Sequence, residues 1–226
     1  LFFSCFLILP VHSSTSMSES PDDVALRLQQ RYDAILSITF AFNQDTRGEM
    51  TGRPRKGSGT GLFYRNNGKN YMRWDYSSPE KQVLLSNGKN FFMYFSNLQQ
   101  MIVSPVENYD ADLTYSFFTG RGNLQRDFYI RPADEELQSS IEDDFQVIKL
   151  IPNAPRSQVQ DIHIWVTSDS LIRRIRIKDH FGTITVLNLS DIEVNTLVNW
   201  YFKGPAAKFW EANPGTYLAM SLAITF

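Results

Sequence analysis

The chain has 226 residues, of which 42% are hydrophobic and 14% aromatic, and its formal net charge is −2. This length suits a single domain, and this composition supports a hydrophobic core and excludes an intrinsically disordered chain. The near-neutral charge excludes the clear basic excess that nucleic-acid binding usually needs, so we predict no nucleic-acid partner.

An apolar run from Leu1 to Leu9 opens the sequence and ends at Pro10. It is far shorter than the roughly 20 residues of a membrane-spanning helix, and small residues suited to a signal peptidase follow it. We therefore predict a signal peptide, with its start missing, over residues 1–14; a buried core helix is the alternative. The one cysteine, Cys5, lies inside this run and not at its end, where a lipoprotein acceptor would lie. We expect an exported, soluble protein without a lipid anchor, a disulfide or a thiolate metal site.

A helix is predicted from Ser20 to about Leu36. Ser20 is a suitable N-cap, Pro21 suits the first helical position, and the acidic pair at 22–23 lies at the positive end of the helix dipole. The apolar positions recur at helical spacing and are Ala25, Leu28, Tyr32 and Ile35. One face of this helix should therefore pack against other apolar side chains.

Alternating segments separated by Asn-Gly pairs follow and predict β-hairpins. Asn67-Gly68 and Asn87-Gly88 each lie between aromatic-rich runs of alternating character. A type I′ turn needs positive φ at both central residues, and Asn and Gly tolerate this conformation best. The predicted strands span about residues 58–65, 71–77, 81–86, 90–96 and 99–104, after an alternating segment at 38–42.

The strand around residue 74 has one apolar and one charged face. Met72, Trp74 and Tyr76 lie on the apolar face, and Arg73 and Asp75 lie on the other, because successive side chains of a strand point to opposite faces. The hairpins therefore specify an antiparallel sheet with one broad apolar face.

The remaining pattern adds one helix and more strands. A second short helix is predicted at 108–118, extended structure at 127–130, and a solvated loop or helical turn in the acidic segment 134–144. Four further strands are predicted at about 145–151, 158–166, 171–178 and 183–191. The fold class is α+β, mainly antiparallel β, with about ten strands. One long sheet of this size tends to curl, and the helices would then cover its concave apolar face.

No motif indicates a catalytic, metal or nucleotide site. His12, His163 and His180 lack metal-ligand spacing. The glycine-rich segment 57–61 precedes a strand, whereas a phosphate loop precedes a helix, so its glycines are better explained by sheet bending or close helix approach. We therefore predict no enzyme, no cofactor and no metal; a cell-envelope hydrolase with a scattered active site is the enzyme alternative.

Arg65 lies in phase with Gly61 and Phe63, so its side chain has two possible directions. If it points to the apolar face, its charge needs carbonyl or carboxylate partners, because an unpaired buried charge is costly. If it opens the turn at residues 66–68, its side chain lies in solvent. The residues alone leave both directions open.

Ordered segments along most of the chain share a pattern with one known family. They are Phe42-Asn43-Gln44, Gly61-Leu62-Phe63-Tyr64-Arg65, Met72-Arg73-Trp74-Asp75-Tyr76, Pro79, Ser86-Asn87-Gly88-Lys89, Phe92-Met93-Tyr94, Phe118-Thr119-Gly120, Asp127-Phe128, Leu150-Ile151-Pro152, Asp179-His180-Phe181-Gly182 and Leu189-Ser190-Asp191-Ile192 through Asn195. In this order and spacing they resemble the outer-membrane lipoprotein carrier family (LolA), periplasmic chaperones of Gram-negative bacteria. The resemblance predicts a carrier-like half-barrel domain over residues 20–205 and leaves the tail, 206–226, unassigned.

The resemblance implies a curled, incomplete β-barrel with helices as a lid over its concave apolar face. It further implies a soluble, monomeric periplasmic chaperone that carries the acyl chains of lipoproteins from the inner to the outer membrane, without a cofactor. The implied partners are acylated lipoproteins, the inner-membrane lipoprotein-releasing ABC transporter and, if present, an outer-membrane lipoprotein receptor. A lipid-binding or lipoprotein-binding sensor or scaffold of the same architecture is the alternative.

Candidate site residues follow from the apolar face and the resemblance together. The predicted lipid-binding residues are Phe40, Phe42, Phe63, Met72, Trp74, Tyr76, Phe92 and Tyr94. The resemblance also implies that Arg65 bonds to the backbone of the lid and holds the cavity shut, which favours its inward direction.

Overall fold

The computed structural model describes residues 19–48, 53–66, 68–106, 122–138, 144–153 and 158–196. The helices of these ranges are α1 (Pro21–Ala34), α3 (Leu124–Asp127) and α4 (Glu135–Gln138). The strands are β1 (Ser37–Arg47), β2 (Arg55–Asn66), β3 (Lys69–Ser78), β4 (Gln82–Ser86), β5 (Asn90–Phe95), β6 (Gln100–Pro105), β7 (Phe128–Pro132), β8 (Phe145–Pro152), β9 (Val159–Thr167), β10 (Ile172–Asp179) and β11 (Ile184–Val194).

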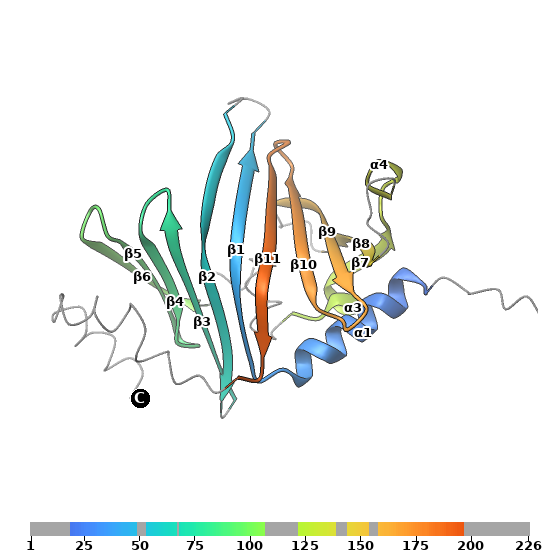
Figure 1. Cartoon of the computed structure of the whole chain (residues 1–226), viewed down its shortest axis with the longest axis horizontal. Coiled ribbons are helices and arrows are strands. Elements are labelled where there is room, and N and C mark those ends of the chain that lie inside the picture. The colour runs from blue at the N-terminus through green and yellow to red at the C-terminus, as the bar shows by residue number, and fades with distance from the viewer. Residues whose placement is uncertain are drawn as a thin grey trace, which may run out of the picture.

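All the strands form one 11-stranded sheet in the order β6-β5-β4-β3-β2-β1-β11-β10-β9-β8-β7. Neighbouring strands are antiparallel. Along the chain, β1 to β6 lead from the middle of the sheet to one edge, and β7 to β11 lead from the other edge back to the middle. The edge strands β6 and β7 do not pair with each other, so the curled sheet stays open (Figure 1). This confirms the predicted class, a mainly antiparallel, incomplete barrel.

Helix α1 begins where the sequence indicates. The Ser20 hydroxyl accepts a hydrogen bond from the Asp23 N–H at 3.2 Å, and Pro21 occupies the first turn. The helix ends at Ala34, because Ile35 is already extended (φ −76°, ψ 124°) and leads into β1. The helix packs against β7, β8 and α3. Its buried side chains are Val24, Ala25, Leu28, Gln29 and Tyr32. Figure 1 shows α1 and α3 at the β7–β10 end of the sheet.

The first hairpin is confirmed at its predicted position, and the second turn is displaced. Asn66 pairs with Lys69 around Gly68, whose φ is +73°. At the second turn the Asn87 N–H donates to the Asn90 carbonyl at 3.2 Å, so Gly88 (φ +83°) and Lys89 are the central residues. A glycine at the first central position is typical of type II′, so the predicted type I′ turn at Asn87-Gly88 is wrong.

Some predicted elements lie outside the described residues. These are the signal peptide over 1–14, the second helix over 108–118 and the tail over 206–226. Conversely, α3 was not predicted: its N-cap, Asn123, accepts from the Arg126 N–H at 2.8 Å, and the Leu124 N–H donates to Gln29 Oε1 of α1 at 3.0 Å. Among the described helices, none is long and apolar enough to span a bilayer.

Candidate functional site

One face of the sheet, which we call the inner face, packs against α1. Residues directly opposite each other in an antiparallel pair project to the same face. The pairs Ile148–Ile164 and Ile164–Ile175 therefore share a face, and all three residues belong to the buried cluster that contains the apolar side of α1. Ile175 pairs with Leu187 of β11, and Leu187 pairs with Gln44 of β1, so the same face continues across β11 into β1. The opposite face is called the outer face.

The inner face of β1, β2 and β3 carries most of the predicted lipid-binding residues. Phe40 pairs with Gly61, and Gly61 pairs with Trp74. The next rows run from Phe42 through Gly59 to Tyr76, and from Phe63 to Met72. We call these six side chains the aromatic wall: Phe40, Phe42, Phe63, Met72, Trp74 and Tyr76.

Trp74 lies at the centre of the aromatic wall. Its ring centroid lies 4.7 Å from that of Phe42, 5.3 Å from that of Phe40 and 6.2 Å from that of Phe63. Phe42 also meets the Tyr76 ring edge to face at 4.9 Å. These spacings lie in the range of favourable aromatic pairs, so the wall is one continuous apolar surface.

Glycines of β2 let the rings lie flat against the sheet. A Cβ at Gly61 would overlap the Phe40 ring, and one at Gly57 would lie 3.3 Å from Cε1 of Tyr76. The sequence suggested that these glycines permit bending or close helix approach. In the structure Gly57 and Gly61 make room for aromatic rings from the neighbouring strands, and Gly59 permits close approach of the β3 backbone at Asp75.

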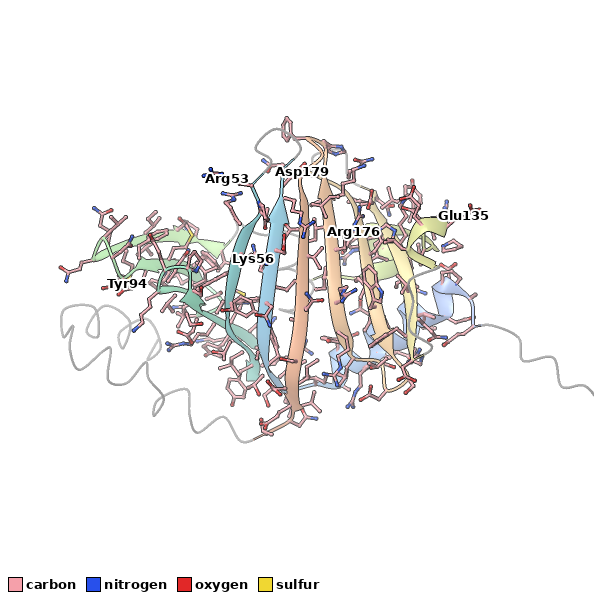
Figure 2. The ribbon with its side chains drawn as sticks, turned by 45° about the horizontal axis from the view of Figure 1, so that its top comes forward. Arg53, Lys56, Tyr94, Glu135, Arg176 and Asp179 are labelled. Carbon is pink, nitrogen blue, oxygen red and sulfur yellow. The ribbon has the colours of Figure 1, made fainter. Side chains whose placement is uncertain are left out.

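The register does not bring Phe92 and Tyr94 to the aromatic wall. Phe92 pairs with Leu85, which pairs with Arg73, so Phe92 lies on the outer face. Tyr94, labelled in Figure 2, lies on the same outer face because it is two residues further along β5. Phe91 and Met93 take their place on the inner face, since Met93 pairs with Leu84 and Leu84 with Trp74.

Most of the wall is buried in this structure. The exposed fraction is 1% for Phe42, 4% for Met72 and 7% for Trp74, while Tyr76 is partly buried. The Tyr76 hydroxyl donates to Gln44 Oε1 at 2.9 Å, and burial raises the pKa of Tyr76, so this donor stays protonated at neutral pH. A ligand can therefore reach the wall only after side chains or backbone move.

Arg65 contacts the C-terminal end of α1. Its Nη1 donates to the Asp33 carbonyl at 2.8 Å, and its backbone N–H donates to the Leu36 carbonyl at 2.8 Å. The sequence left open whether the Arg65 side chain finds a carbonyl partner or lies in solvent at the turn; in the structure it has the carbonyl partner. A shallow pocket between α1 and β2 is lined by Arg65, Phe63 and Tyr32, among others. The contact joins α1 to the strand that carries Phe63.

Arg27 fixes α1 at the opposite half of the sheet, and sequence reasoning missed it. Its guanidinium donates to the Ser168 carbonyl at 3.1 Å, to Ser170 Oγ at 2.5 Å and to Gln146 Oε1 at 2.5 Å. The Tyr32 hydroxyl accepts from the Ile172 N–H at 3.2 Å, and burial raises the pKa of Tyr32. An arginine between apolar helix positions is usually solvated, so only the fold reveals this role.

The histidines belong to no metal-binding group in the described residues. His163 is fully buried on the outer face, with Nε2 3.2 Å from Asp134 Oδ2 and Nδ1 3.4 Å from Asp161 Oδ1. Burial lowers the pKa of His163, while the two carboxylates oppose that shift. His180 is exposed in a turn, and His12 lies outside the described residues. No group of three His, Cys, Asp or Glu side chains in the described ranges could hold a metal ion.

The sequence comparisons with known proteins agree on one family. The family model described as "Outer membrane lipoprotein carrier protein LolA" matches residues 33–203. An outer-membrane lipoprotein carrier protein of Nitrosomonas europaea is 24% identical over 191 residues, which cover 84% of this chain and 84% of that protein. One of Methylococcus capsulatus is 23% identical over 207 residues, with 90% and 95% covered. The crystal structure of a LolA superfamily protein from Nitrosomonas europaea aligns at 15% identity and a TM-score of 0.42, covering 84% of this chain and all of that one (100%).

Proposed function

The chain belongs to the LolA family of outer-membrane lipoprotein carrier proteins, and on this premise we propose that it is a periplasmic chaperone for lipoproteins. It binds their acyl chains against the aromatic wall and carries them from the inner to the outer membrane. The single observation that supports this best is the continuous aromatic surface around Trp74, which joins the apolar core under α1.

The chemistry of the wall suits acyl chains. Each methylene moved from water into an apolar site gains roughly 0.8 kcal/mol, so the acyl chains of a lipoprotein cannot cross an aqueous compartment uncovered. Rings packed around Trp74 offer apolar area without charged groups. The wall needs no nucleophile, base or cofactor, because binding and release involve no covalent step.

Because the wall is buried without ligand, a bound acyl chain must hold the carrier open, and closing of the carrier favours release. Entry of an acyl chain must open the space over Trp74, and the hydrogen bond from Arg65 to the Asp33 carbonyl is a contact that opening would break. The ligand-free closed state and the open loaded state then differ by a few kcal/mol, which limits affinity and permits transfer. Arg65 acts here as the latch between β2 and α1.

The partners follow from the same proposal. An inner-membrane lipoprotein-releasing ABC transporter loads the carrier, and an outer-membrane lipoprotein receptor, where one exists, unloads it. The carrier works as a soluble monomer in the periplasm.

Binding of a fluorescent acylated peptide tests this function. The purified protein should bind a diacylated peptide, and the same peptide without acyl chains should bind at least about a hundredfold more weakly, since only the former buries methylenes. Mass spectrometry of what co-purifies from the periplasm should then find acylated proteins. Equal binding of both peptides, or binding of neither, would contradict the proposal.

A further inference from the structure

Two hairpin ends lie side by side at the end of the sheet remote from Arg65. Arg47, the last residue of β1, pairs with Ile184 of β11, and Ile184 pairs with Lys178 of β10. Thr46 pairs with Arg55 at the start of β2. The β10–β11 turn and the start of β2 therefore flank the end of β1. We call this region the basic hairpin end.

Phe181 lies at the tip of the β10–β11 turn and is 76% exposed. The turn holds it there: Asp179 Oδ1 accepts from the Phe181 N–H at 2.8 Å and from the Thr183 N–H at 2.7 Å. Gly182 adopts a φ of +79° and its N–H donates to the Asp179 carbonyl at 3.2 Å. A phenyl ring this exposed forfeits the free energy of burial, and the turn that carries it is held by backbone hydrogen bonds to Asp179.

Basic side chains share this end of the sheet with the ring. The cations of the basic hairpin end are Arg47, Arg53, Arg55, Lys56 and Lys178. Its carboxylates in the described residues are Asp45, which pairs with Arg47 at 3.1 Å, Asp179, which caps the turn, and the buried Asp161, which lies opposite Lys178 on β9. His180 is exposed beside Phe181. Figure 2 labels Arg53 and Asp179 at this end and Lys56 further along β2. The region therefore combines positive charge with one projecting apolar ring.

We propose that the basic hairpin end binds the surface of a bilayer that contains anionic phospholipids. Phe181 enters the boundary between headgroups and acyl chains, and the surrounding arginines and lysines contact lipid phosphates. An aromatic side chain among cations is the pattern of interfacial membrane anchors. Among the exposed large apolar side chains in the described ranges, Phe181 alone lies at this end, whereas a standard protein interface buries roughly 800 Å² per partner around an apolar centre; one ring among cations therefore favours a membrane over a protein partner.

The position of the tip is compatible with transfer at a membrane. Arg55 and Arg65 lie near opposite ends of β2, so contact at the tip leaves the Arg65–Asp33 contact free to open. Membrane contact and acyl binding are therefore separate properties of the chain, and each can be measured without the other.

Co-sedimentation with vesicles tests the proposal. The wild-type protein should bind phosphatidylcholine vesicles that contain phosphatidylglycerol more tightly than pure phosphatidylcholine vesicles, and high salt should weaken this binding because it screens charge. Phe181→Ser should lower the partition coefficient about tenfold. Arg55→Gln and Lys56→Gln should each lower it about fivefold.

Leu98→Ser is the matched control. Leu98 is 58% exposed in the turn between β5 and β6, away from the basic hairpin end, so this variant should bind vesicles like the wild type. All variants should keep wild-type affinity for the acylated peptide, which separates this proposal from the carrier function. An equal loss in Leu98→Ser, or no preference for the anionic vesicles, would overturn the proposal. Absence of wild-type vesicle binding, with charge-dependent capture of an acidic protein, would overturn it in favour of a protein partner.

Discussion

Replacing Trp74 with aspartate should abolish binding of the acylated peptide. Trp74 is 7% exposed, and its ring contacts those of Phe40, Phe42 and Phe63. The change removes the central ring of the wall and places a carboxylate where an acyl chain would lie. The unpaired charge in an apolar site costs about 3 kcal/mol or more, so affinity should fall by at least about a hundredfold. Fluorescence anisotropy of the labelled peptide measures this loss.

Phe92 of β5, which the register places on the outer face, supplies the control for this variant. Phe92 is as deeply buried as the wall, at 4% exposed, but lies on the outer face of the same sheet. Phe92→Asp should therefore destabilise the fold while the folded fraction, measured by circular dichroism, keeps its affinity. Trp74→Leu retains an apolar side chain and should bind within about tenfold of the wild type. Wild-type affinity in Trp74→Asp, or loss of affinity in folded Phe92→Asp, would refute the site.

Removing the Asp75 carboxylate should destabilise the fold by about 3 kcal/mol, because it leaves a buried charge without its partner. The Arg73 side chain is 4% exposed, and its Nε and Nη2 donate to the two oxygens of Asp75 at 2.6 and 2.7 Å. This pair lies on the outer face of β3, behind the aromatic wall. Urea unfolding of Asp75→Ala at pH 7 measures the effect.

Two further variants separate the buried pair from surface charge. Asp45→Ala breaks the pair with Arg47, whose side chain is 72% exposed, and should lower the stability far less than Asp75→Ala because solvent screens this pair. The double variant Arg73→Met/Asp75→Ala removes the buried Arg73 charge together with its partly exposed partner and should recover most of the lost stability. A similar loss in Asp45→Ala and Asp75→Ala, or no recovery in the double variant, would show that the pair is not buried in solution.

Strand positions could be predicted from the sequence because local signals specify them. The alternation around Trp74 and the Asn67-Gly68 turn set the pairing of β2 with β3, where Asn66 meets Lys69. The N-cap at Ser20 and the proline after it likewise set the start of α1. These signals act within a few residues and do not depend on the rest of the fold.

The inward face of β5 could not be predicted in the same way. It depends on the connection from β3 to β4, residues 79–81, whose length decides which face each strand presents. A change of one residue moves every side chain to the other face. For this reason Phe91 and Met93 line the inner face, whereas Phe92 and Tyr94 were predicted to do so.

The anchors of α1 depend on contacts between distant parts of the chain. Arg27 meets Gln146 and Ser170, and Arg65 meets the Asp33 carbonyl, across more than thirty residues of sequence. No local pattern reports such partners. Only the family resemblance favoured the inward direction of the Arg65 side chain. The structure shows its contact with the backbone of α1. Its role as a latch remains a prediction.

Photo-crosslinking with an acylated peptide tests the central claim most directly. A peptide with a diazirine in its acyl chain, irradiated with the wild-type protein and digested for mass spectrometry, should label inner-face residues such as Phe42, Trp74 and Phe91, because these line the proposed acyl site. Excess unlabelled acylated peptide should remove the label. Labelling of the outer face at Phe92 or Tyr94, or no label that competes, would contradict the assignment of the aromatic wall as the acyl-binding surface.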